Sequence, residues 1–164
     1  MDIEAALQWL QNTAVGTAIR ENEILFPWIE SVHVLAIVLV VGTISIVDLR
    51  LIGVASLDRA VSRLLRDVLP YTWGAFVVAA ISGILLFTSN AVTYAHNFFF
   101  LGKMILLAFA GFNMAIFHMT GIRGIEHWGV AQQTPLAAKT AGAVSLLVWV
   151  SVIVFGRWIG FTLH

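Results

Sequence analysis

Cysteine is absent from this chain of 164 residues. Its absence excludes disulfide bonds, thiolate nucleophiles and zinc–sulfur sites, and the redox compartment cannot be read from cysteine usage. No serine or threonine stands in a recognisable nucleophile motif, and the sequence carries no metalloprotease helix motif. Both absences argue against a hydrolase.

Charge is scarce as well. Charged residues make up 11% of the chain, and nine basic residues balance nine acidic ones to a formal net charge of zero. Nucleic-acid binding needs a basic surface, so we expect no nucleic-acid partner. Asp2 and Glu4 stand where a signal peptide carries basic residues, and no apolar core follows at once. We therefore expect no cleavable signal peptide.

Long apolar stretches fill most of the sequence, and 60% of its residues are hydrophobic. A soluble domain of this length could not bury so much apolar surface, because its surface-to-volume ratio is too high. A membrane core about 30 Å thick needs about 20 apolar residues of helix. Four stretches without a charged residue meet or approach that length, at 31–47, 68–102, 104–122 and 140–156. The sequence predicts an integral membrane protein whose main partner is the lipid bilayer.

The expected fold is all-α, a bundle of four transmembrane helices with a short interfacial helix before it. Lipid-exposed backbone must satisfy its own hydrogen bonds, which favours helices for all four spans. Residues 2–12 are amphipathic and should lie in the interface, with Trp9 at headgroup depth. We expect one membrane domain over residues 1–164, with spans of about 27–51, 70–89, 97–121 and 138–163.

The segment 57–69, between the first two spans, predicts a basic surface helix that ends before Pro70. Arg59, Arg63 and Arg66 share one face of this helix. Such a face either anchors the chain to anionic lipids or is simply solvated, and the sequence leaves both interpretations open.

Basic residues in short loops indicate the orientation of the chain. Six of them lie in or beside the first and third loops, against two (Arg20 and Arg157) on the opposite side. Because loops rich in Lys and Arg stay in the cytoplasm, we expect a multi-pass protein of the bacterial inner membrane with both termini periplasmic.

Four ionisable residues at membrane depth are the candidate functional residues. Span one carries His33 and Asp48, and span three carries Lys103 and His118, each pair 15 residues apart. The two spans run parallel, and 15 residues of helix rise about 22 Å. We therefore expect His33 beside Lys103 near the outer face, Asp48 beside His118 near the inner face, and an apolar zone between the two layers.

Span four should add Arg157 to the outer layer and Lys139, beside Arg50, to the inner layer. Each of these residues also has a structural explanation. The three basic side chains lie near helix ends and can extend to the interface, and a membrane histidine often bonds a neighbouring helix. His96 and His127 lie in loops, where we expect surface residues, although imidazole binds iron and copper readily.

The chain resembles a family of small bacterial four-span membrane proteins catalogued as a domain of unknown function. The resemblance covers essentially the whole chain and implies a bacterial inner-membrane protein of no established activity. It is carried by Ile19-Arg20-Glu21, His33, Asp48-Leu49-Arg50-Leu51-Ile52-Gly53, Leu69-Pro70-Tyr71-Thr72-Trp73, Phe117-His118, Pro135, Ala138-Lys139 and Gly156-Arg157-Trp158.

A weaker resemblance links the chain to four-helix membrane b-type cytochromes. In those proteins haem lies between helices near each membrane face, held by histidines about 13–15 residues apart on one helix. Here the spacing matches but each helix has one histidine, and Asp48 or Lys103 stands at the other position. The resemblance implies ligation by histidine with another residue, by one histidine, or by residues of two subunits.

The first functional hypothesis is therefore a cytochrome that carries electrons within or across the membrane, with a redox protein or quinone as partner. His33 would ligate an outer haem b and His118 an inner one, and copper is the alternative metal. Asp48 would orient His118. The propionates would be neutralised by Lys103 and Arg157 on the outer side and by Arg50, Arg123 and Lys139 on the inner side.

Two other hypotheses remain open. In a small proton-coupled carrier, His33, Lys103, Asp48 and His118 would act as relay groups. In a non-catalytic membrane protein, the same residues would only fix helix packing and topology. Glycines in the spans allow close helix approach, so we also expect a homo-oligomer, a dimer or a trimer.

Overall fold

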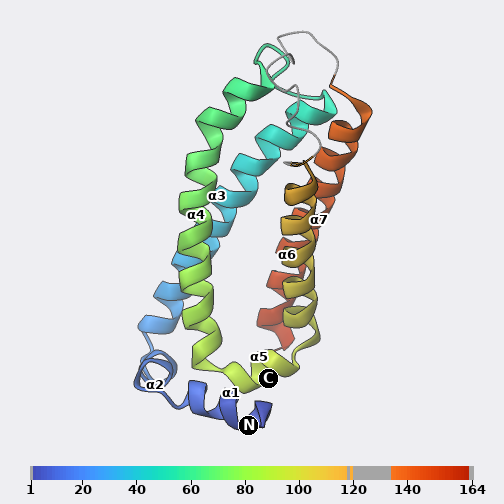
Figure 1. Cartoon of the computed structure of the whole chain (residues 1–164). Helices are drawn as coiled ribbons and strands as arrows, with labels where there is room; N and C mark the ends of the chain where they lie inside the picture. The colour runs from blue at the N-terminus through green and yellow to red at the C-terminus, as the bar shows by residue number, and fades with distance from the viewer. Residues whose placement is uncertain (1, 118, 120–133, 163–164) are drawn as a thin grey trace.

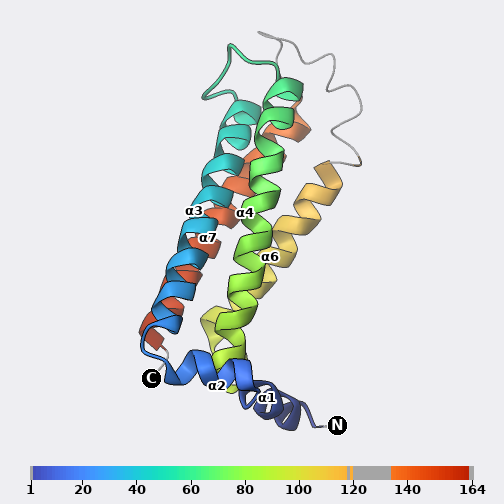
Figure 2. The ribbon, with the colours of Figure 1, turned by 90° about the vertical axis from the view of Figure 1, so that its left-hand side faces the viewer.

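The computed structural model describes residues 2–117, 119 and 134–162, and these form helices without any strand. Long helices stand side by side as a bundle, and short helices lie at one of its ends (Figure 1). The helices are α1 (Ile3–Gln11), α2 (Ala14–Glu21), α3 (Leu25–Ile52), α4 (Val61–Ser89), α5 (Ala91–His96), α6 (Phe98–Ile116) and α7 (Leu136–Thr162). We call the end with α1, α2, α5 and the last turn of α7 the terminal end, and the opposite end the loop end (Figures 1 and 2).

The four long helices α3, α4, α6 and α7 are each long and apolar enough to cross a membrane. Their outward faces carry large apolar side chains, and Leu35, Ile84 and Ile105 are each about two thirds exposed. In water such exposure would be unfavourable, whereas lipid solvates it. The chain is therefore a multi-pass membrane protein, and the predicted all-α bundle with its short N-terminal helix is confirmed.

The second spanning helix begins earlier in the sequence than expected. Residues 57–69 do not form a separate surface helix, because α4 begins at Val61 and continues through Pro70 to Ser89. A proline removes only one backbone donor, and long membrane helices tolerate that loss when neighbouring helices pack around it. The basic residues Arg63 and Arg66 thus lie on the first turns of the spanning helix itself.

Two short helices were not predicted. The first of them, α2, lies between α1 and α3, and its first turn is capped by the Thr13 hydroxyl, which accepts from the Gly16 amide at 3.2 Å. A second short helix, α5, separates α4 from α6. Neither segment has a long apolar period, so their helical state depends on caps and on contacts with the bundle.

Arg20 holds the terminal end together. Its guanidinium donates to the backbone oxygen of Gln11 at 3.2 Å and to that of Ser89 at 3.1 Å, which ties the last turns of α1 and α4 to α2. Gly16 allows this approach, since a Cβ there would lie 2.8 Å from the Thr88 oxygen. These bonds satisfy carbonyl groups that a helix end leaves without partners.

The bundle is built from two helical hairpins. Helix α3 packs on α4, α6 packs on α7, and α3 and α7 join the two pairs. The middle of the bundle is apolar, with a core of Val40, Ala75, Ala110, Val148, Trp149 and Val152. A second cluster at the loop end consists of Val47, Leu51, Val61, Leu64 and Ala138. The apolar zone expected beyond the outer layer is therefore present, apart from the Thr72 hydroxyl, which donates to that of Thr43 at 2.8 Å.

Candidate functional site

His33 of α3 is the central residue of the candidate site, and its ring lies against α4. Its Nδ1 is 2.9 Å from the backbone oxygen of Ala79 and 3.0 Å from Oγ of Ser82. A carbonyl oxygen can only accept, so Nδ1 carries the hydrogen and donates it. The Ser82 hydroxyl donates to the Val78 oxygen at 2.7 Å, which leaves its oxygen free to accept from His33. The network thus assigns the Nδ1–H tautomer, with a lone pair on Nε2.

Lys103 of α6 faces that lone pair. Its Nζ lies 3.5 Å from Nε2 of His33, in reach of a long hydrogen bond. Gly156 of α7 borders the Lys103 side chain, because a Cβ there would lie 3.7 Å from Nζ. The predicted pairing of His33 with Lys103 is confirmed, and residues of all four long helices meet at this point. We call His33, Ser82, Gly83, Lys103 and Gly156 the histidine–lysine site.

Gly83 allows the His33 ring to pack closely against α4. A Cβ at residue 83 would lie 3.0 Å from Cε1 of His33, closer than nine in ten ordinary contacts of this kind. Ala79, Ser82 and Gly83 follow the helical i, i+3, i+4 spacing and share one face. Sequence reasoning missed this face, although a run of small residues opposite a histidine is a signal that could have found it.

Aromatic rings close the site toward the terminal end. Phe87 of α4 stacks on Phe100 of α6, with ring centroids 5.3 Å apart, and Tyr94 of α5 lies 5.4 Å from Phe100. Burial raises the pKa of the Tyr94 hydroxyl above its ordinary value, and the charge of Glu30 raises this pKa further. Phe100 is thus packed against α4 and α5.

Arg157 is not part of the histidine–lysine site. Its side chain is exposed, and its guanidinium carbon lies 4.5 Å from the centre of the Phe161 ring, one turn further along α7. That distance is a cation–π contact at the surface. The structure therefore brings Lys103 to His33, but it leaves Arg157 at the rim of the terminal end.

At the loop end, Asp48 is buried between α3 and α7 with 5% of its surface exposed. Its Oδ2 has no hydrogen-bond partner in the described ranges, and its carboxyl group interacts with the Ser145 side chain. Gly142 allows α7 to approach, since a Cβ there would lie 3.1 Å from the backbone oxygen of Asp48. Nearby, the Asn113 amide donates to the Ala141 oxygen at 3.1 Å.

Arg50 does not neutralise Asp48. It is buried, with 2% exposed, and its Nε donates to the backbone oxygen of Arg59 at 2.8 Å. Residues two apart on a helix point to different sides, so Arg50 reaches the 53–60 connection while Asp48 faces α7. Lys139 of α7 is half-buried. Across the described chain, no ion pair joins Asp48 to a basic side chain.

Of the other three candidate histidines, the structure describes only His96. His118 and His127 lie outside the described residues, as does Arg123, so the expected pairing of Asp48 with His118 stays a prediction. His96 is exposed at the terminal end, where its Nε2 lies 3.8 Å from a Glu4 carboxyl oxygen. Within the described ranges no three acidic or histidine side chains gather as a metal-binding group.

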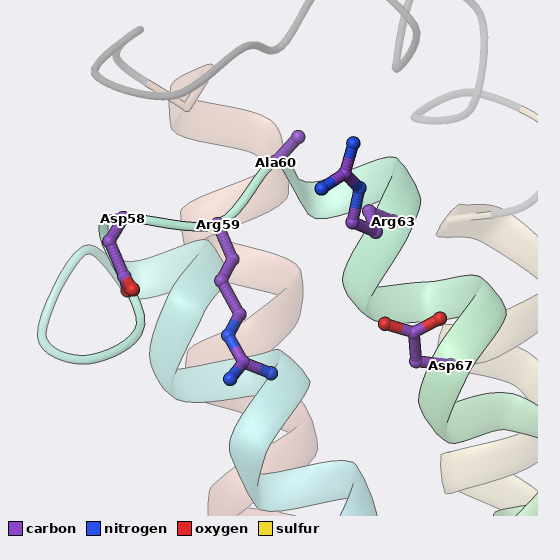
Figure 3. A pocket seen from close by; sticks show the side chains of 5 residues that line it. All are labelled: Asp58, Arg59, Ala60, Arg63 and Asp67. Carbon is purple, nitrogen blue, oxygen red and sulfur yellow. The ribbon is translucent and has the colours of Figure 1, made fainter.

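An open pocket of about 450 Å³ lies at the loop end, where the chain enters α4 (Figure 3). Its lining carries both signs of charge, with Arg59 and Arg63 beside Asp58 and Asp67. The structure describes no ion pair among these four side chains. The arginines of the predicted basic face therefore border acidic neighbours, and this favours a solvated face over a purely anionic-lipid anchor.

Comparison with known proteins identifies the family of this chain. No curated protein and no solved structure matches this chain. The match is to the family of unknown function DUF6644, and it spans residues 7–162, which include α3, α4, α6 and α7 and every residue of the histidine–lysine site. The chain therefore belongs to the DUF6644 family of unknown function.

Proposed function

We propose that this protein is a membrane cytochrome that binds haem b at the histidine–lysine site and carries electrons. The observation that carries the proposal is the tautomer of His33. Its Nδ1–H donates to the Ala79 oxygen at 2.9 Å, so the lone pair that could bind a metal is on Nε2, the nitrogen that faces Lys103. A metal-bound histidine has this arrangement, in which the second nitrogen donates to a carbonyl and fixes the ring.

Lys103 supplies a second nitrogen on the opposite side. Its Nζ faces Nε2 of His33 directly, at 3.5 Å. Lys103 would help to hold the haem group, either as a ligand through its neutral amine or as the cation that neutralises a propionate.

The surroundings support the proposal. Phe87 and Phe100 stack on the terminal side of the site, and the apolar core of α3, α4, α6 and α7 lies on the other side. Bound haem would supply one-electron chemistry, with a potential set by the axial ligands and the apolar environment. The redox partner or quinone that exchanges electrons with it would approach from the membrane or the terminal end. A second haem at His118 would lie among residues outside the described ranges.

The test is the absorbance spectrum of the protein purified from cells supplied with haem precursor, or reconstituted with haemin. We expect a Soret band that is lost in His33→Ala and shifted in Lys103→Met. His96→Ala is the matched control, because His96 is an exposed histidine at the terminal end. A wild-type protein that stays colourless after reconstitution, while its helical circular dichroism is intact, would exclude the cytochrome.

The second candidate is a small proton-coupled carrier. The observation that favours it is Asp48, a buried carboxyl group in the loop-end half of the bundle with an unpaired oxygen. Ionisable residues inside membrane helices often mark ion pathways. The core around Val40 and Val152 lies between this residue and His33, so a proton would have to cross a mostly apolar layer. This separation favours electron transfer, which needs no polar route.

We also propose that the protein resides in a bacterial inner membrane with its terminal end in the periplasm. Arg50, Arg59, Arg63 and Arg66 lie at the loop end, and basic residues favour the cytoplasmic side. A phosphatase fused after residue 164 should be active, whereas a fluorescent reporter that needs the cytoplasm should stay dark. The reverse result would overturn this orientation.

The exposed apolar faces of the bundle also leave room for helix contacts between copies. Gly42 and Gly111 have open space where a side chain would stand, in α3 and α6 respectively. We propose a dimer or trimer that packs through such faces. Native mass spectrometry in detergent should detect it, and a monomer at all detergent ratios would contradict this proposal.

A further inference from the structure

Asp48 is the one acidic residue of the described spans that is buried in the bundle, with 5% of its surface exposed. Among the residues that the structure describes, its Oδ2 has no hydrogen-bond partner. Buried polar atoms in native proteins almost always have partners, so an orphaned carboxyl oxygen calls for an explanation. The explanation cannot be a local ion pair, because Arg50 donates its Nε to the Arg59 oxygen on another side of α3.

The groups that face Asp48 are mostly apolar or neutral. From α7 they are Gly142 and Ser145, and Ser145 is the side chain that interacts with the carboxyl. The loop-end cluster around it is built of Val47, Leu51, Val61, Leu64 and Ala138, with Leu65, Val68 and Phe117 packed against it.

The charged groups of the elements packed here are directed elsewhere. Lys139 of α7 is half-buried and forms no ion pair with Asp48 within the described residues. Arg63, Arg66 and Asp67 of α4 are exposed. His118, which follows α6, lies outside the described residues. The described structure therefore holds no cation that could balance a carboxylate at this position.

An uncompensated carboxylate in a membrane interior is far less favourable than the neutral acid, and such groups usually neutralise instead of staying charged. We propose that Asp48 is a proton-binding site: its carboxyl group holds a proton at neutral pH and exchanges it with water at the loop end of the bundle. Binding forms one O–H bond on a carboxylate oxygen, and release returns the proton to water. Ser145 positions the carboxyl group.

This proposal does not rest on haem binding. Asp48 lies 15 residues after His33 on the same helix, a rise of about 22 Å. The Val40 and Trp149 core separates the two positions. A protein without haem absorbance would contradict the cytochrome proposal and would not affect the proposal for Asp48. The two proposals can therefore be tested separately.

The test is labelling of the full-length protein in lipid vesicles with dicyclohexylcarbodiimide, a membrane-soluble reagent that needs a protonated carboxyl group. The carboxyl proton moves to one carbodiimide nitrogen while the carboxyl oxygen adds to the central carbon. The product rearranges to a stable N-acylurea, and no atom leaves. Peptide mass spectrometry locates the adduct along the chain.

We expect the adduct on Asp48 at neutral pH, with its yield falling as the pH rises. Asp58 and Asp67 are internal controls, because both are exposed at the same end of the bundle and should stay unlabelled. Asp48→Asn should lose the adduct, and Asp67→Asn should keep it on Asp48. No adduct on Asp48 at neutral pH, with a buried protonated carboxyl of a reference membrane protein labelled in the same vesicles, would overturn the proposal.

Infrared spectroscopy is a second test, which needs neither the carbodiimide nor a variant that folds. The infrared spectrum of the wild type should contain the carbonyl stretch of a protonated carboxyl group at neutral pH, and this band should move toward carboxylate bands at high pH. Only carboxylate bands at neutral pH would also overturn the proposal. Asp48→Glu should retain the protonated band, because it keeps the group that binds the proton.

Discussion

Nε2 of His33 and Nζ of Lys103 lie 3.5 Å apart, across the space between α3 and α6. This contact sets the two parallel helices in register at one depth of the membrane. Since the His33 ring is also bonded to α4 and Lys103 is bordered by Gly156 of α7, the contact connects both helical hairpins.

The register can be tested by crosslinking, which the absence of cysteine makes unambiguous. We expect a His33→Cys/Lys103→Cys variant to be joined by a short bismaleimide, because the native side chains span the distance between α3 and α6. An Asp48→Cys/Lys103→Cys variant should not be joined, since its residues differ in depth by about 22 Å. Crosslinking measured by mass spectrometry that favours the second pair would contradict this register.

Gly83 should be far less tolerant of a side chain than Gly74 on the same helix. A Cβ at 83 would lie 3.0 Å from Cε1 of His33, whereas a Cβ at 74 has nothing within 4 Å. We expect Gly83→Ala to lower the free energy of unfolding by about 1–3 kcal/mol through overpacking. Gly74→Ala should leave it unchanged or raise it by up to about 1 kcal/mol. Unfolding in mixed detergent micelles compares the two, and equal effects would argue against a close His33–Gly83 contact.

Arg20 should be essential for the order of the terminal end. Arg20→Ala removes the bonds to the Gln11 and Ser89 oxygens, and we expect a loss of about 1.5–3 kcal/mol because both bonds are charge-assisted. Hydrogen exchange should accelerate in α1 and α2 and stay slow in α6. Glu21→Ala, a change at the exposed neighbour, is the control. Unchanged exchange in α1 would show that Arg20 does not hold this end.

Tyr94 should make the protein sensitive to alkaline pH. Burial and the nearby charge of Glu30 raise the pKa of its hydroxyl in the folded state. The folded state therefore holds the proton more tightly than the unfolded state. Its contribution to stability is complete below the ordinary tyrosine pKa of about 10 and is lost as the pH rises above it. We expect Tyr94→Phe to flatten the fall in unfolding temperature at alkaline pH, and an unchanged fall would rule out this linkage.

The four spans and the depth of the polar residues could be predicted from the sequence. Lipid solvates apolar side chains and gives the backbone no hydrogen-bond partner, so charge-free stretches of sufficient length become helices that cross the membrane. The equal spacing of His33 to Asp48 and of Lys103 to His118 then predicts two polar layers. The first layer is confirmed by the His33–Lys103 contact.

The sequence-based predictions failed at two places where contacts between helices decide the local structure. Pro70 looked like the start of a helix, but the packing of α4 against α3 continues the helix through it. The helix α2 was missed because its stability comes from the Thr13 cap and the Arg20 bonds, and not from an apolar period.

The sequence by itself determined that this chain is a membrane protein, that it crosses the membrane as helices, and that His33 and Lys103 lie at one depth, because lipid favours helical spans and the helical rise fixes depth along them. The tertiary structure decided which polar atoms meet. In the folded chain, Nδ1 of His33 donates to the Ala79 oxygen and Nε2 faces Lys103. Arg50 donates to the Arg59 oxygen, and Oδ2 of Asp48 has no partner among the described residues. Those pairings depend on the rotation and register of the packed helices. Packing between side chains of different helices sets both, and the periodicity of the sequence does not reveal them.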